Sequence, residues 1–201
     1  MRAHPGGRAI GDRSWFDRPA PEVAVDLLGA RLIHDSLDGR VGGRIVEAEA
    51  YQGPEDLAAH SARGRTPRNA VMFGRPGHLY VYLIYGLHHC ANVVCGPGEK
   101  PEAVLLRALA LDVGLELARR RRGAGIPDRR LASGPGNVCR ALGIDRRLNG
   151  ADLLAGPVWI EPAPQPTRPM ARTRVGVEYA GDWAARPLRF LIPDDPHVSR
   201  R

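Results

Sequence analysis

The order of the strand-like and helix-like segments limits the folds open to this chain. Alternating and β-branched apolar patterns predict strands at 30–35, 43–51, 78–85, 90–95, 103–109, 158–161 and 174–179. Patterns typical of helices lie at 19–28, 55–60, 111–122 and 133–143. Because the two kinds of segment do not alternate regularly, a doubly wound parallel sheet is a poor match. We predict one α+β domain, with a curved, mostly antiparallel β-sheet flanked by helices and a protruding β-hairpin.

Length and charge narrow the class of protein. A chain of 201 residues suits a single domain with a substantial core. We expect a flexible lead at 1–14, the domain at 15–196 and a short basic tail at 197–201. The formal net charge of +7 favours a polyanionic partner. Lys100 is the only lysine, so nearly all of the positive charge is carried by arginine. A genomic preference for arginine would also explain this excess of arginine over lysine.

The N-terminal sequence and the cysteines predict a reduced, cytoplasmic protein. The first residues lack the apolar core of a signal peptide. No run approaches the roughly 18 apolar residues that a membrane span needs. Cys90, Cys95 and Cys139 are an odd number without zinc-like spacing. We therefore expect no membrane association and no cofactor.

Two glutamates and a tyrosine share one face of the strand predicted at 43–51. In this strand Glu47, Glu49 and Tyr51 alternate with Val46, Ala48 and Ala50. Strands avoid glutamate, so the pair requires an explanation. A carboxylate among apolar groups has a raised pKa, which suits a general base. Glu49 is the leading candidate. Two alternatives remain open, a surface glutamate on an edge strand and a partner for one of the many arginines. Glu47, about 6.6 Å away, fits equally well by spacing alone.

Arg107 stands inside an apolar run, Ala103 to Leu106, that predicts a strand. A buried arginine is costly unless it is paired, and Glu49 would satisfy it. Alternatively the strand lies at an edge and Arg107 is in solvent. If the two residues pair, they can orient a water molecule between them.

Three tyrosines mark the strongest strand signal, residues 78–85. Tyr80 and Tyr82 share a face, and Tyr85 stands where Gly86 turns the chain. Core packing, stacking on a ligand and hydrogen bonding are three possible roles. Another is that a tyrosine at a hairpin tip of a basic protein inserts between stacked bases.

Adjacent histidines and a cysteine, His88, His89 and Cys90, also allow a metal site. Neighbouring side chains on a strand point to opposite faces, so two of these imidazoles would not easily share one ion. Buried thiols beside surface histidines are the simpler interpretation, and we predict no metal.

Taken together, these residues resemble the alkyladenine (3-methyladenine) DNA glycosylase family. The matching blocks are IVEAEAYQGPEDLAAHS (45–61), RTPRNAVMFGRPGHLYVYLIYGLHHCANV (65–93), AVLLRALA (103–110) and LASGPGNVCRALGI (131–144). They run in consistent order over about three quarters of the chain. The resemblance implies a monofunctional glycosylase of base excision repair, which flips an alkylated or deaminated purine out of duplex DNA and hydrolyses the N-glycosidic bond with a Glu-activated water.

The resemblance also implies roles for individual residues. Glu49 would be the general base, and Arg107 and the main chain of Val158 would help to hold the water. The other roles are the base pocket (Tyr51, His60, Tyr82 and Asn92), the wedge in the base stack (Tyr85) and phosphate contacts (Arg65, Arg68, Ser133 and Gly134). We expect a monomer that acts on double-stranded DNA with damaged purines and is nucleoid-associated when bound.

Two rival functions come from other classes. A non-catalytic nucleic-acid-binding domain on the same fold predicts that Glu49 is dispensable and that affinity ignores lesions. A metal-dependent hydrolase built on His88, His89 and Cys90 predicts sensitivity to chelators. The sequence leaves the lesion preference and the identity of any general acid open.

Overall fold

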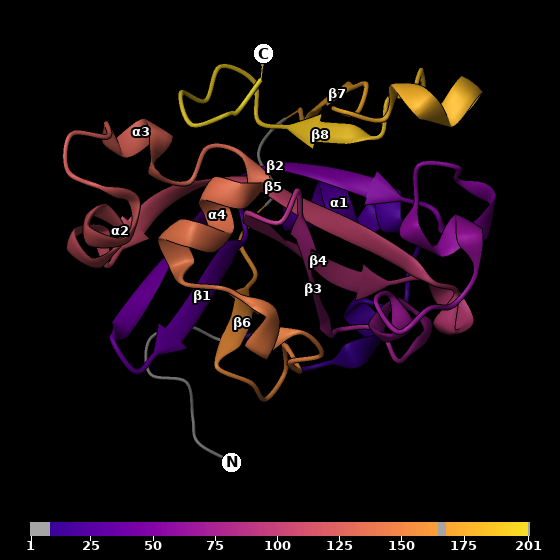
Figure 1. The fold of residues 1–201 in the computed structure, drawn as a ribbon, viewed down its shortest axis with the longest axis horizontal. Coiled ribbons are helices and arrows are strands. Elements are labelled where there is room, and N and C mark those ends of the chain that lie inside the picture. The colour runs from indigo at the N-terminus through magenta and orange to yellow at the C-terminus, as the bar shows by residue number, and fades with distance from the viewer. Residues whose placement is uncertain (1–8, 165–167, 201) are drawn as a thin grey trace.

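The computed structural model describes residues 9–164 and 168–200, and its framework is one open antiparallel sheet (Figure 1). The strands are β1 (Arg31–Ser36), β2 (Gly39–Tyr51), β3 (Leu79–Ile84), β4 (His88–Cys95), β5 (Glu102–Val113), β6 (Val158–Glu161), β7 (Met170–Arg172) and β8 (Arg189–Leu191). The main path is β3-β4-β5-β2-β1-β6, and every pair in it is antiparallel. The predicted α+β class is confirmed.

Strand β2 lies inside the sheet and pairs with neighbouring strands along both of its edges. One edge pairs with β5 along nearly its whole length, while the other pairs first with β1 and then, at residues 47–49, with β8. The register to β5 shifts on both sides of Glu47, and such irregularities bend a strand and re-aim its side chains. Residues 47–51 therefore lie in the middle of the sheet, with a strand on each side at 47–49.

The helices are short and cover the sheet around β5. They are α1 (Ala20–Leu27), α2 (Leu115–Arg122), α3 (Asp128–Leu131) and α4 (Pro135–Leu142). Figure 1 shows α4 in front of the sheet and α1 behind it, and both contribute buried apolar residues to one continuous core. Gly134 (φ 101°) and Gly143 (φ 73°) bound α4, so glycine supplies a backbone conformation that other residues rarely adopt. Among the described residues, no helix is long and apolar enough to cross a bilayer.

The hairpin of β3 and β4 has a three-residue connection, Tyr85 to Leu87, between the paired residues Ile84 and His88, with Tyr85 and Gly86 at the centre of its turn. Both residues have positive φ, 52° and 68°, as type I′ turns require, and the Leu87 N–H donates to the Ile84 carbonyl. The turn leaves Tyr85 87% exposed and Leu87 78% exposed. The predicted hairpin is thus confirmed, with a tyrosine displayed at its tip.

Three predicted elements are wrong in detail. Residues 111–113 were predicted to begin a helix, but they extend β5, because Leu111 and Val113 pair with Gly43 and Gly42 of β2. The segment 55–60 is not one helix: 3₁₀ turns at Gly53–Glu55 and His60–Arg63 flank it. Residues 174–179 form no strand, since the Val175 N–H donates to a side chain instead of a neighbouring strand.

The two ends of the described chain are packed against the domain. Ile10 is buried and its N–H donates to the Ile160 carbonyl; residues 1–8 of the expected lead lie outside the described residues. Ser199 and Arg200, expected in a basic tail, contact buried side chains of the sheet. Arg201 also lies outside the described residues.

Candidate active site

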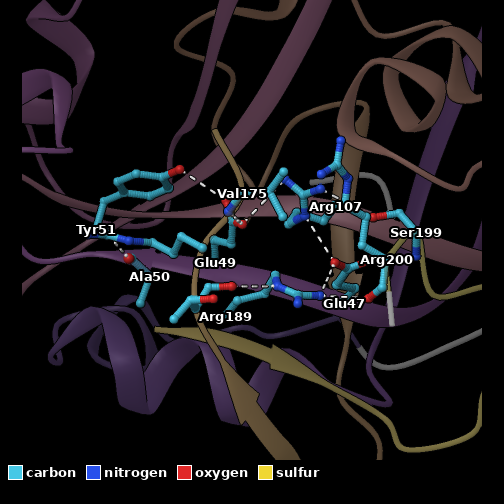
Figure 2. A network of polar contacts seen from close by, with 11 residues as sticks. Glu47, Glu49, Ala50, Tyr51, Arg107, Val175, Arg189, Ser199 and Arg200 are labelled. Atoms are coloured by element: carbon cyan, nitrogen blue, oxygen red, sulfur yellow. Dashed lines mark hydrogen bonds and ion pairs between the residues drawn. The ribbon is translucent and has the colours of Figure 1, made fainter. Parts of the chain in front are cut away.

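Glu49 is fully buried and accepts hydrogen bonds at both carboxylate oxygens (Figure 2). The Val175 N–H donates to Oε1 at 2.8 Å, and the Tyr51 hydroxyl donates to Oε2 at 3.0 Å. Arg107 Nη1 lies 3.4 Å from Oε1. The surface alternative for Glu49 is therefore wrong, and so is the solvent alternative for Arg107, which is 5% exposed in a central strand.

The environment of Glu49 raises its pKa. Burial is the largest cause, and the Arg107 charge, the Val175 N–H and the Tyr51 hydroxyl oppose it. Burial, and then the charge of Glu49, raise the pKa of Tyr51 well above its ordinary value, so its hydroxyl stays protonated and donates. A carboxylate with a raised pKa that remains paired with a cation has the character expected of a general base.

Glu47 differs from Glu49 in its partners. It is also fully buried, but it accepts from two arginines, Arg107 Nε at 3.1 Å and Arg189 Nη1 at 3.0 Å, and from the Ser199 N–H at 2.7 Å. Figure 2 shows these contacts converging on Glu47, on the side of Arg107 away from Tyr51. The sequence could not separate the two glutamates, whereas the geometry does.

A cavity of about 220 Å³ lies beside this network. Tyr51, Arg107 and Val175, which all contact the Glu49 carboxylate, line this cavity. Polar and aromatic side chains form much of the remaining wall: His60, Tyr80, Tyr82, Cys90, Asn92 and Tyr179. The four residues predicted for a base pocket all line this one cavity, together with Tyr85.

The aromatic side chains of the cavity wall contact one another. His60 Nδ1 lies 2.9 Å from the Tyr80 hydroxyl, and the His60 and Tyr82 rings meet edge to face at 4.5 Å. Burial, and then the nearby Arg68 charge, lower the pKa of His60 to about 4, so the ring is neutral at pH 7. Asn92 Nδ2 donates to the Tyr80 carbonyl at 3.1 Å, which fixes its amide at the cavity wall.

Two of the residues predicted to contact phosphates are exposed arginines. Arg65 is exposed, and Arg68 folds back over the Tyr82 ring at 5.1 Å while donating to the Leu83 carbonyl. Ser133 and Gly134 precede α4, whose first residue, Pro135, lines the cavity. The Gly134 N–H donates to the Arg107 carbonyl at 2.9 Å, so this amide is already engaged.

Val158 is not at the site, and the prediction for its main chain is wrong. It lies in β6 opposite His34 of β1, which in turn lies opposite Val41 of β2. From residue 41 to Glu49 a straight strand would run roughly 26 Å. The main-chain contact to the carboxylate comes instead from Val175, which the sequence interpretation placed in a strand.

Sequence reasoning also missed a buried ion pair behind Tyr51. Arg174 and Asp56 side chains are both 0% exposed and make two contacts, at 2.5 and 2.9 Å. The Arg174 guanidinium lies 4.7 Å from the centre of the Tyr51 ring, and the next residue is Val175. Nothing in the sequence pairs residues 118 positions apart, so only the fold reveals this support.

The histidines and cysteine considered for a metal site do not converge. In the hairpin register, His88, His89 and Cys90 lie opposite Ile84, Leu83 and Tyr82. Within the part of the chain that the structure describes, no group of three His, Cys, Asp or Glu side chains is placed to hold a metal ion.

Comparison with known proteins supplies the family. The family model described as methylpurine-DNA glycosylase matches residues 14–196. The chain belongs to the methylpurine-DNA glycosylase family. A relative from Methanocella arvoryzae, provisionally named 3-methyladenine DNA glycosylase, is 47% identical over 190 residues, covering 94% of this chain and 95% of its own. The mouse protein DNA-3-methyladenine glycosylase is 46% identical over 201 residues, covering 92% of this chain and 60% of its own.

Membership of the methylpurine-DNA glycosylase family confirms the resemblance seen in the sequence. It makes the chain a DNA repair glycosylase, a hydrolase that acts on DNA. The matched range contains Glu49, Arg107, Val175 and the whole aromatic cavity.

Proposed function

We propose that the protein is a monofunctional glycosylase that flips alkylated or deaminated purines out of duplex DNA and hydrolyses their N-glycosidic bond with a water activated by Glu49. The observation that supports this most strongly is the buried Glu49 carboxylate, held by Arg107 and the Val175 N–H beside an aromatic cavity. This arrangement combines a base of raised pKa with a site for a flat ligand.

The chemistry requires a water at the floor of the cavity. A water beside the Glu49–Arg107 pair would donate to the carboxylate and accept from the guanidinium. As the bond between the sugar and the purine breaks, its electron pair leaves with the base and positive charge develops on the sugar. Glu49 stabilises that charge and takes up a proton of the attacking water, whose oxygen bonds to the sugar carbon. An alkylated, cationic purine leaves as a neutral base, and a neutral deaminated purine takes up a proton from solvent as it leaves. The main chain at this site is that of Val175, whose N–H donates to the carboxylate, and not that of Val158, which was predicted to help hold the water.

The cavity wall suits a flipped purine. Tyr51, His60 and Tyr82 offer rings on which a base can stack, at about 1–3 kcal/mol per base. That energy is comparable to the few kcal/mol that flipping costs, and a damaged pair costs less. Exposed Tyr85 at the hairpin tip would fill the gap left in the stack, entering from the minor groove.

Hydrolysis by water is favoured over a lyase reaction. A lyase needs a neutral amine to form a Schiff base with the sugar. Lys100 carries the only side-chain amine of the chain. It pairs with Glu102 at 3.2 Å and Glu55 at 3.3 Å, and it is not among the residues that line the cavity. Slight burial lowers the pKa of Lys100, but these two carboxylates outweigh it and raise the pKa overall.

The partner in this proposal is double-stranded DNA that contains a damaged purine, bound by a monomer. The net charge of +7 and the exposed Arg65 and Arg68 suit phosphate contacts. Ser133 and Gly134 precede Pro135, which lines the cavity. Binding should weaken steeply with salt, because phosphate contacts release counterions.

One panel of duplexes tests the proposal. Each duplex carries a single hypoxanthine, ethenoadenine, 3-methyladenine analogue or undamaged adenine, and free base is measured with and without a chelator. We expect release from at least one damaged duplex, little from the undamaged one, and no effect of the chelator. Binding without release would favour a binding module, and loss of activity with chelator would favour a metal-dependent hydrolase. A borohydride-trapped adduct at Lys100 would contradict the monofunctional mechanism.

A further inference from the structure

We propose that Glu47 and Ser199 are positioning residues, which together hold the Arg107 guanidinium against Glu49, so that the segment 195–200 completes the active site. This inference rests on the proposed role of Glu49. It gives a function to a buried glutamate that touches no part of the cavity and to residues that look like a basic tail in the sequence.

Each nitrogen of the Arg107 guanidinium has a different partner (Figure 2). Nε donates to Glu47 Oε1 at 3.1 Å, Nη2 donates to Ser199 Oγ at 3.2 Å, and Nη1 lies 3.4 Å from Glu49 Oε1. A guanidinium is a rigid planar fork, so fixing two of its nitrogens fixes the direction of the third. Glu47 and Ser199 thereby set where Nη1 meets the catalytic carboxylate.

Ser199 is itself held in place by several anchors. Its N–H donates to Glu47 Oε2 at 2.7 Å, and the following carbonyl, of Arg200, accepts from Arg189 Nη1 at 2.8 Å. Four residues earlier, Asp195 is buried and pairs with Arg44 at 2.7 Å. These contacts fold the segment back onto the sheet, directly over the Glu47 carboxylate.

The buried charges of this network balance. Glu47 and Glu49 are 0% exposed and Arg107 and Arg189 are 5% exposed, which gives two negative and two positive groups. The titratable groups that act on Glu49 come from three strands: Glu47 and Tyr51 of β2, Cys90 of β4 and Arg107 of β5. Since these groups are fixed, a change at Glu47 or Ser199 acts on Glu49 mainly through charge and through the position of Arg107.

Two substitutions should move the pKa of Glu49 in opposite directions. Glu47→Gln keeps an oxygen for Arg107 Nε but removes the neighbouring negative charge, so the pKa of Glu49 falls. Ser199→Ala changes no charge but frees Arg107 Nη2, so the cation is held less firmly and the pKa of Glu49 rises. The fall in Glu47→Gln reports the charge of Glu47. The rise in Ser199→Ala reports positioning, because a merely structural role of Ser199 would leave the pKa of Glu49 unchanged.

The experiment follows the side-chain carboxyl of Glu49 by ¹³C NMR across pH, with Glu49→Gln used for assignment. Two matched controls carry the same chemical changes elsewhere. Glu102→Gln removes a buried glutamate that pairs with Lys100, and Ser36→Ala removes a hydroxyl that accepts from Arg121 Nη2 at 2.9 Å. We expect opposite shifts in Glu47→Gln and Ser199→Ala and no shift in either control.

Two further readouts accompany the titration. Hydrogen exchange of the Ser199 amide should quicken in Glu47→Gln, because an amide nitrogen then faces that N–H. Single-turnover base release should fall about tenfold in Ser199→Ala with the melting temperature unchanged.

An unchanged Glu49 titration in Ser199→Ala would overturn the inference, even if Glu47→Gln fails to fold. The titration also separates this inference from the proposed function. If the expected shifts occur while the unmodified protein releases no base, the positioning network stands and the glycosylase mechanism fails.

Discussion

Removing Asp56 should destabilise the protein strongly, because it would leave Arg174 buried without its ion pair. Both side chains are 0% exposed, and Asp56 also accepts from the N–H groups of Gln52 and Ala58 at 3.1 and 3.0 Å. Breaking a buried pair costs about 3–5 kcal/mol. For a chain of this length, that corresponds to a fall in melting temperature of roughly 10 °C. We therefore expect Asp56→Ala to lose about 4 kcal/mol of unfolding free energy, measured by urea denaturation.

A matched exposed pair provides the control. Asp128 meets Arg119 with similar two-point geometry, at 3.0 and 2.7 Å, but the Asp128 side chain is 51% exposed and the Arg119 side chain 39% exposed. Asp128→Ala should leave stability almost unchanged, as solvent already screens that pair. The variant Asp56→Ala/Arg174→Met should be more stable than Asp56→Ala alone, since no charge remains buried. Equal losses for Asp56→Ala and Asp128→Ala, or no recovery in the double variant, would refute the reasoning.

Three further predictions follow from single contacts. Tyr51→Phe removes a hydroxyl that lowers the pKa of Glu49, so the acid limb of the single-turnover pH profile should move to higher pH; an unmoved limb would exclude this contact. Tyr85→Ala should weaken binding to a lesion duplex several-fold while Leu87→Ala, at the same exposed tip, changes it less, as measured by fluorescence anisotropy. His60 has a pKa of about 4 when folded and 6.5 as its ordinary value, so it contributes stability that is present above pH 6.5 and is lost as pH falls towards 4. His60→Gln should flatten that part of the stability profile by up to about 3 kcal/mol, and an equally steep profile would contradict the assignment.

Much of the fold follows from local patterns. The hairpin of β3 and β4 has a long β-branched and aromatic run broken by Gly86, and α4 lies between two glycines. The pairing of Glu49 with Arg107 could also be expected, since a charged residue in each of two apolar strands needs a partner.

The other features of the fold and the site depend on contacts between distant residues, which a local sequence pattern does not predict. Val175 and Val177 alternate with Arg174 and Gly176, and this pattern indicates a strand. In the structure the Val175 N–H instead donates to Glu49, and Arg174 pairs with Asp56. The roles of Glu47 and Ser199 depend on a contact between positions 152 residues apart. Such pairs become visible only when β2, β5 and β8 are assembled.

The most direct test of the central claim compares base release by Glu49→Gln and Glu102→Gln under single-turnover conditions. Both substitutions neutralise a buried glutamate, but only Glu49 meets Arg107 and Val175 beside the cavity. With folding of each variant verified by circular dichroism, we expect Glu49→Gln to lose at least a hundredfold in rate, the lower range for a positioned general base, and Glu102→Gln to retain most of it. Release undiminished in Glu49→Gln would contradict the account.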